Sequence, residues 1–179
     1  RNETVHNPAR ITYVLLGTGL LWFGWFGFNA GSALSASALA SSAFVSTHLA
    51  AAAGAIAWML AEQIRNGKPS ALGAISGAVA GLATVTQGAG FVAPLSGALI
   101  GLIAGFVCYF MVAMVKNKFG YDDSLDVVGV HGVGGTWGAL ATGLFASKAV
   151  NAAGSDGLFF GNPAQLWVQF VSVASTWIF

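Results

Sequence analysis

The chain has 179 residues, of which 56% are apolar and only 7% are charged. Soluble domains carry about 25% charged residues, so this composition excludes a globular domain with a water-facing surface. The net charge of +1 argues against a basic surface that binds nucleic acid, and the single cysteine, Cys108, excludes an intrachain disulfide framework.

Long uncharged runs predict membrane-spanning helices. No Lys, Arg, Asp or Glu occurs between Arg10 and Glu62 or between Lys68 and Lys116. Each run is long enough for two helical crossings, because about 20 apolar residues span a bilayer. We therefore predict an all-α, polytopic membrane helix bundle. The expected spans, separated by Gly, Pro and polar breakers, are 11–32, 43–64, 70–87, 95–115 and 125–146, followed by a partial sixth run from Ala164.

The positive charges predict the orientation of these spans. If the spans alternate in direction, six of the seven Lys and Arg residues fall on the side where residue 1 lies, and only Lys148 falls on the other side. Cytoplasmic loops of membrane proteins carry an excess of Lys and Arg, so we expect the residue 1 side to be cytoplasmic. The six are Arg1, Arg10, Arg65, Lys68, Lys116 and Lys118.

The first span ends in an aromatic and glycine-rich segment. Trp25, Phe28, Asn29 and Ser32 are spaced by three or four positions, so on a helix they share one face. The spacing leaves open whether this face is an interfacial aromatic belt or the lining of a pore. In a pore, the rings would attract a small cation and the Ser hydroxyl could accept a hydrogen bond from it.

Two of the three histidines, His6 and His48, precede the last full span. His48 lies in the second span, among Ala and Ser and without a glycine-rich or aromatic setting in the sequence. We expect it to serve packing or an interhelical bond. His6 lies in the polar leader, where we expect it to be solvated.

Glycines recur at intervals of four in the third and fourth spans. Small residues at this spacing form a flat helix face that lets another backbone approach closely. The alternative is poor helix formation, but the repeat on two helices favours close packing. Cys108, within the fourth span, is expected to be a small buried residue. The glycines are Gly73, Gly77 and Gly81 in the third span and Gly97, Gly101 and Gly105 in the fourth.

The fifth span opens with Asp126 and carries His131 among several glycines. A histidine inside a membrane helix indicates a functional site by default. We expect a neutral imidazole that points inward and can pass a hydrogen bond or a proton; the alternative is a structural histidine bonded between helices. Asp126 is expected to cap the helix N-terminus rather than to act in catalysis.

The sequence predicts neither a metal site nor a cofactor. His48 and His131 fall on different spans, and neither has a second potential ligand three or four residues away. No Gly-rich phosphate loop precedes a helix, and no Ser-His-Asp arrangement can be placed. We therefore do not expect an enzyme.

Two of these segments carry a resemblance to a known family. Residues 24–32 and 126–132 resemble signature segments of the ammonium transporter (Amt/Mep/Rh) family, and residues 67–70, 76–82 and 90–94 match it in the same order. The resemblance implies a fold of two inverted five-helix repeats plus a last long helix, in homotrimers with one pore per subunit. Residues 1–179 would be part of its transmembrane domain, spans six to ten plus the start of eleven, without the first repeat and the C-terminal region.

The resemblance also implies roles for five residues. Ser32 is similar to the hydroxyl of an outer site that recruits ammonium among aromatic rings, and Phe28 resembles one of two phenylalanines that gate the pore below it. Trp25 resembles a pore-lining aromatic residue. His131 resembles one of two hydrogen-bonded histidines in the lumen, and Val127 a residue nearer the inner mouth.

The expected function is therefore transport of ammonium across the cell membrane. The cation would be recruited, deprotonated and conducted as ammonia plus a proton through an apolar pore with a paired-histidine relay. The resemblance also implies methylammonium as a second substrate and a PII-type signalling protein as a partner. The sequence leaves two alternatives open, an ammonium sensor with a cytoplasmic signalling domain and an unrelated channel or structural bundle.

Overall fold

The computed structural model describes residues 10–179, and the described part is built from helices. Arg1 and His6 lie outside the described residues. The all-α prediction is confirmed. The elements, in chain order, are α1 (Ile11–Asn29), η1 (Gly31–Ala33), α2 (Ala38–Asn66), α3 (Ala71–Val85), α4 (Pro94–Phe110), the π-helix η2 (Met111–Lys116), α5 (Asn117–Phe119), the π-helix η3 (Val128–Val133), α6 (Gly134–Phe145), η4 (Leu158–Phe160) and α7 (Pro163–Ile178).

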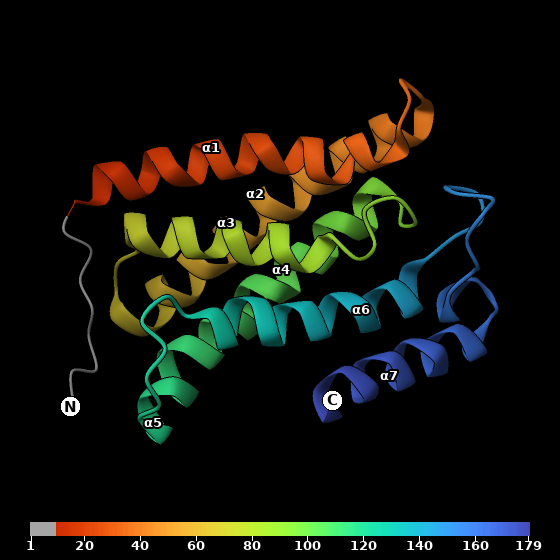
Figure 1. The fold of residues 1–179 in the computed structure, drawn as a ribbon. Helices are drawn as coiled ribbons and strands as arrows, with labels where there is room; N and C mark the ends of the chain where they lie inside the picture. Colours follow the sequence, from red (N-terminus) through yellow and green to blue (C-terminus); the bar gives the residue numbers. More distant parts are fainter. Residues whose placement is uncertain (1–9) are drawn as a thin grey trace.

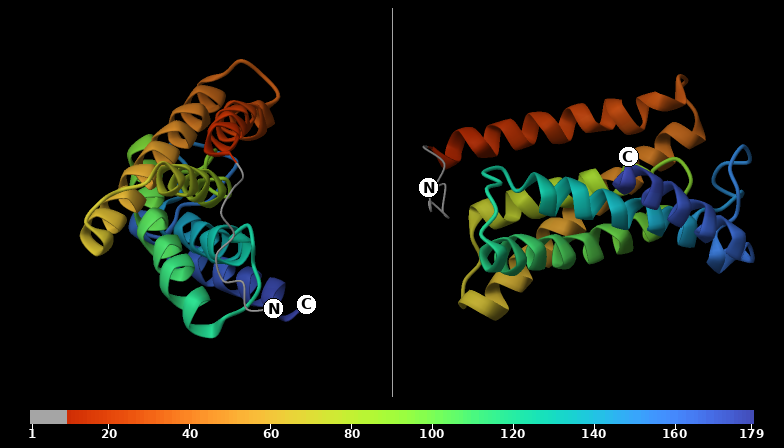
Figure 2. Two further views of the ribbon diagram at one scale, coloured as in Figure 1. Left: turned by 90° about the vertical axis from the view of Figure 1, so that its left-hand side faces the viewer. Right: turned by 60° about the horizontal axis from the view of Figure 1, so that its bottom comes forward.

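The longer helices form a bundle with α3 at its centre. Figure 1 shows α3 between α1 and α6, and α7 beside α6. In the end view of Figure 2, α2 and α4 lie on one side of α3, while α1, α6 and α7 lie around its other side. Within the described residues α1 packs on α2 and α3 but makes no contact with α6 or α7. The bundle is therefore open between α1 and the α6–α7 pair.

The predicted spans all appear as helices, but α3 is shorter than expected. Within residues 10–179, three segments are long and apolar enough to cross a membrane: Ile11–Ala33, Ala38–Asn66 and Pro94–Phe119. Helix α3 has only 15 residues and is about 22 Å long, against about 30 Å for a bilayer core. Most of α3 is buried by neighbouring helices. These helices, and not the length of α3, therefore keep the polar backbone groups at its ends away from lipid.

Local sequence signals explain where the helices begin and end. The Ser37 hydroxyl accepts a hydrogen bond from the Ala40 N–H at 3.3 Å, so α2 starts five residues before the predicted span. Gly67 ends α2 with a φ of 74°, a conformation that favours glycine. Ser70 caps α3 through the Gly73 N–H at 2.8 Å, and Pro94 is the first residue of α4.

The glycine repeats bring α3 and α4 into contact with the same residues of α2. At four of these glycines an added Cβ would lie closer than 3.0 Å to the backbone of α2. The predicted close packing is thus confirmed, and α2 is the helix that both repeats contact. Cys108 is fully buried, as expected. The contacts are Gly81 and Gly101 against Ala50, and Gly77 and Gly105 against Gly54.

Most of the described charged residues lie at one end of the bundle. Arg10 precedes α1, Arg65 and Lys68 lie at the connection from α2 to α3, and Lys116 lies beside α5; Figure 1 shows these three places at the same end. Lys148 lies in the loop between α6 and α7, at the opposite end. The helices therefore alternate in the way that the charge pattern predicts.

Candidate functional site

The aromatic face of α1 places its polar atoms inside the bundle. The Trp25 Nε1–H donates to Thr86 Oγ1 at 2.8 Å, and the Asn29 amide donates to Thr47 Oγ1 at 3.0 Å. The rings of Trp25 and Phe28 meet edge to face, with centroids 6.3 Å apart. Residues of an interfacial belt would turn these polar atoms toward lipid headgroups. The bonds to α2 and to the end of α3 instead direct these atoms into the bundle, and a pore-lining role of this face stays a prediction.

A cavity of about 230 Å³ lies beside this face, and we call it the Ser32 cavity. Phe28, Asn29 and Ser32 line it from α1 and η1, and Thr86 and Gln87 line it from the turn after α3. The Ser32 hydroxyl donates to the Phe28 carbonyl oxygen at 2.5 Å. Because its proton is used in that bond, its oxygen lone pairs remain open to accept a hydrogen bond from a ligand.

A second cavity of about 480 Å³ lies between η3, α6 and α7, and we call it the His131 cavity. His131 is exposed to it, and no described residue forms a hydrogen bond with the imidazole. The Trp177 Nε1–H donates to Thr136 Oγ1 at 2.8 Å, which holds the indole near Gly132. The described residues therefore give no support to a histidine bonded between helices.

The two cavities are neighbours along the open face of the bundle. Gln87 lines both of them. Trp25 and Phe28 also line an apolar hollow of about 480 Å³ on α1, so Phe28 joins this hollow to the Ser32 cavity. The structure thus brings Trp25, Phe28 and Ser32 together, and places His131 next to them across Gln87.

The lining of the two cavities is nearly free of charge. No Asp, Glu, Lys or Arg lies among the described residues that line either cavity, and His131 is the one titratable side chain there. In the described part of the chain no three His, Cys, Asp or Glu side chains gather in a way that could hold a metal ion. Such a lining can attract a small cation through ring faces and lone pairs, without a fixed negative charge that would hold it tightly.

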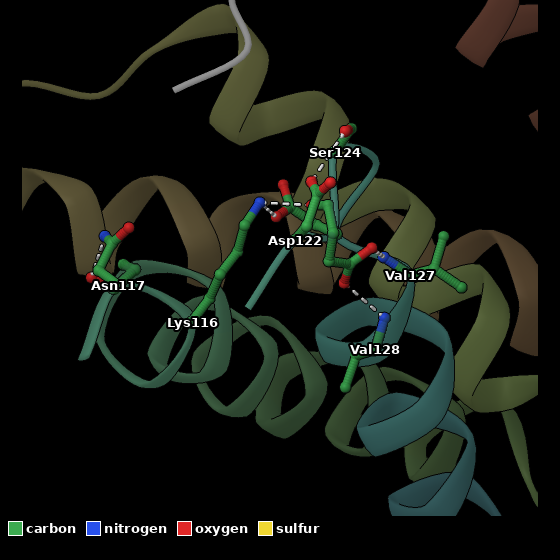
Figure 3. A network of polar contacts seen from close by, with 9 residues as sticks. Lys116, Asn117, Asp122, Ser124, Val127 and Val128 are labelled. Carbon is green, nitrogen blue, oxygen red and sulfur yellow. Dashed lines mark hydrogen bonds and ion pairs between the residues drawn. The ribbon is translucent and has the colours of Figure 1, made fainter. Parts of the chain in front are cut away.

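The prediction that Asp126 caps the fifth span is wrong. Asp123 takes that role, because its two carboxylate oxygens accept from the Val127 N–H at 2.9 Å and the Val128 N–H at 2.8 Å. Asp126 adopts a φ of 56° and forms an ion pair with Lys116 at 2.6 Å instead. Figure 3 shows Lys116, Val127 and Val128 in this polar network. The left-handed turn at Asp126 directs its side chain away from the helix N-terminus.

Val127 lies apart from the other candidates. Its side chain is 48% exposed, and none of the described cavities includes it. It lies at the start of η3, at the same end of the bundle as Lys116. A role near the inner mouth remains a prediction.

His48 packs against α1, as expected, but in an aromatic setting that its sequence neighbours did not indicate. Its ring centroid lies 5.4 Å from that of Trp22 and 6.0 Å from that of Phe26. Both rings come from α1, so the neighbours of His48 in the sequence gave no sign of them. None of the described cavities includes His48.

Sequence reasoning missed four polar or aromatic residues of the cavities. Thr86 and Gln87 form a polar pair at the end of an apolar run, just before Gly88, and this break in the run was a usable signal. Thr136 and Trp177 carried no comparable signal, because their bond joins residues 41 positions apart.

Comparisons with known proteins agree on one family. The sequence model of the Ammonium Transporter Family matches residues 1–179. The ammonium transporter of Bacillus subtilis (strain 168) is 52% identical over 179 residues, which are all of this chain and 44% of that relative. The crystal structure of Saccharomyces cerevisiae Mep2 superposes with a TM-score of 0.89 at 38% identity, over 94% of this chain and 39% of Mep2.

A sensor Amt protein of known structure is also similar. It superposes with a TM-score of 0.83 at 29% identity, over 98% of this chain and 43% of the sensor. The chain therefore spans less than half the length of each of these three relatives.

Proposed function

Because this chain belongs to the ammonium transporter family, we propose that its two cavities are part of a path that carries ammonium across a membrane. The observation that carries the proposal is the position of His131. Its imidazole is exposed in a cavity that shares Gln87 with the cavity of Phe28 and Ser32. The ammonium transporter of Bacillus subtilis is more than twice as long as this chain. The activity is therefore proposed for the whole protein and not for these residues alone.

The first proposed step is recruitment of the cation at the Ser32 cavity. The faces of Phe28 and Trp25 attract a small cation through their ring quadrupoles. The Ser32 oxygen, with its proton engaged by the Phe28 carbonyl, can accept a hydrogen bond from an ammonium N–H. Together these groups replace part of the hydration shell at the entrance.

The second proposed step is loss of a proton near His131. An ammonium ion without water in an uncharged channel is unfavourable by several kcal/mol or more, whereas neutral ammonia is not. A neutral imidazole can take up a proton on one nitrogen and release one from the other. The proposed paired relay needs a second imidazole, and among the described residues the other histidine, His48, contacts Trp22 and Phe26 instead. We therefore assign the partner to protein beyond these residues.

This chemistry would also select against potassium. Potassium has no proton to release, so it would have to cross the uncharged lining as an ion. Methylammonium carries N–H protons and could follow the same route, subject to the space at Phe28.

Replacement of His131 tests the proposal. In the protein expressed from its complete gene and reconstituted in liposomes, His131→Ala should abolish ammonium-evoked current or its selectivity over potassium. His48→Ala is the matched control, because it also removes a membrane histidine but leaves both cavities intact. Currents in His131→Ala that match wild type in size and selectivity would contradict the proposal.

A sensor is the second candidate, and the structural similarity to the sensor Amt protein favours it. A sensor would bind ammonium at the same Ser32 cavity but carry little or no flux. Ammonium-dependent stabilisation without ammonium-evoked current in wild-type liposomes would support the sensor over the transporter.

We also propose a membrane orientation and an assembly. The end that carries Arg65, Lys68 and Lys116 would face the cytoplasm, in accord with the positive-inside rule, and the protein would reside in the cell membrane. The family resemblance supports a homotrimer and, as a further proposal, a PII-type signalling protein as partner. Cross-linking in native membranes tests the trimer directly.

A further inference from the structure

Gln87 occupies the junction of the two cavities. It lies in the turn that follows α3 and is exposed. Among the described residues it is the one that lines both the Ser32 cavity and the His131 cavity. Its neighbour Thr86 holds Trp25 through the 2.8 Å hydrogen bond. A ligand that moves along the lined side of the path from one cavity to the other therefore comes close to the Gln87 side chain.

The hydrogen bonds of Gln87 define which end of its amide faces the cavities. With the nitrogen toward the end of α3, the amide donates to the Thr84 carbonyl at 2.6 Å and to the Ala83 carbonyl at 3.2 Å. The opposite orientation would set the amide oxygen against these two carbonyl oxygens. The nitrogen is thus held by the helix, and the oxygen points away from it.

The oxygen then lies toward His131. In this orientation the atom nearest to an added Cβ on Gly135, at 3.5 Å, is the amide oxygen. Gly135 lines the His131 cavity and follows His131 by one helical turn. No described residue donates a hydrogen bond to this oxygen. The amide therefore presents an unused acceptor to the cavity, with its position fixed by two bonds on the other side.

We propose that the Gln87 oxygen binds the cargo between Ser32 and His131 by accepting a hydrogen bond from an ammonium N–H, and that Gln87 is therefore a specificity-determining residue of the path. This inference rests on the proposed function. A neutral acceptor stabilises the cation after it leaves Ser32, yet has no full negative charge that would trap it before it reaches His131. Potassium needs several such oxygens to replace its hydration shell, so a single amide oxygen compensates it poorly.

Two substitutions separate this role from a purely structural one. Gln87→Leu removes both the acceptor and the amide donor. Gln87→Lys keeps a donor that can reach the carbonyl oxygens at the end of α3, but it removes the acceptor and adds a positive charge. If Gln87 only stabilises the end of α3, Gln87→Lys should recover the ammonium affinity that Gln87→Leu loses. If the oxygen accepts a hydrogen bond from ammonium, Gln87→Lys should weaken ammonium binding more than Gln87→Leu does.

The experiment measures ammonium-evoked current against ammonium concentration, and ammonium-dependent thermal stabilisation, in the protein expressed from its complete gene. Gln63 supplies the matched control, because its amide also donates to a carbonyl near a helix end, that of Gly67 at 3.0 Å, but it lines neither cavity. We expect Gln87→Leu to raise the apparent KM for ammonium about tenfold, the loss of one hydrogen bond to a charged group, and Gln87→Lys to raise it further. Gln63→Leu and Gln63→Lys should match wild type.

Each outcome decides the inference. An apparent KM for Gln87→Leu equal to wild type, or its recovery in Gln87→Lys, overturns the role of the oxygen while transport itself stands. A wild-type protein that binds ammonium without current identifies a sensor, and the same shifts are then read from the thermal stabilisation. A wild-type protein that neither binds nor moves ammonium overturns the proposed function and this inference with it.

Discussion

Asp123 shows how one carboxylate can start the helix that carries a functional histidine. It accepts from the first two free N–H groups of η3, three residues before the turn at Asp126. Free N–H groups at a helix N-terminus that lose a side-chain acceptor are left to water, which stabilises the helix less than the cap does. The position of His131, one turn further on, therefore depends on a residue that never contacts the cavity.

Loss of this cap should be measurable. Asp123→Ala should lower the free energy of unfolding by about 1 kcal/mol and speed hydrogen exchange at the amides of Val127 and Val128. Mass-spectrometric exchange in detergent is the measurement, and Asp126→Asn is the control, since it weakens the Lys116 pair and leaves the cap. Faster exchange of these amides in Asp126→Asn than in Asp123→Ala would refute the assignment.

The sequence identified those site residues whose arrangement is local to one helix. Trp25, Phe28 and Ser32 share a face because their spacing follows the helical repeat. The break in the apolar run at Thr86 and Gln87 was a signal in the sequence, but the place of Gln87 between the two cavities depends on the contact of α3 with α6. The sequence also assigned the cap to Asp126 without considering Asp123. The positive φ of Asp126, which accompanies its ion pair with Lys116, is visible only in the structure.

At the scale of whole helices, α2 acts as the common support of α3 and α4. The same backbone atoms of Ala50 receive Gly81 from α3 and Gly101 from α4. Interval-four glycines predicted close packing, but they could not name the partner, because a flat face fits any helix with small residues. The span lengths were overestimated for α3 since hydropathy does not distinguish lipid contact from burial among other helices.

A single methyl group should test this support. Gly101→Ala would place a Cβ against the Ala50 backbone, which cannot move as a side chain can, so we expect a loss of about 1–3 kcal/mol in the free energy of unfolding. Gly19→Ala is the matched control, because nothing in the described structure lies within 4 Å of the added Cβ. Reversible unfolding in detergent compares the two. Equal stability of both variants would show that the helices can separate without cost.

At the scale of the whole molecule, the row of cavities is open on one side. Helix α1 does not contact α6 or α7 within the described residues, so the path between Ser32 and His131 has a wall on one side only. Conduction of a cation that has lost its water requires enclosure, because exposed water would compete for every hydrogen bond on the way. Transporters built from inverted repeats place their path between the two repeats. The proposed function therefore requires further protein against this face.

The orientation of the bundle follows from its charges and can be tested from outside the cell. Lys68 and Lys148 lie at opposite ends of the bundle, and both are exposed. We expect Lys148→Cys to react with a membrane-impermeant maleimide on intact cells, and Lys68→Cys to react only after permeabilisation, because the positive-inside rule holds Lys68 in the cytoplasm. The unsubstituted protein is the control, since Cys108 is fully buried and should stay unlabelled. The reverse labelling pattern would place Ser32 on the cytoplasmic side and make the proposed recruitment site an exit.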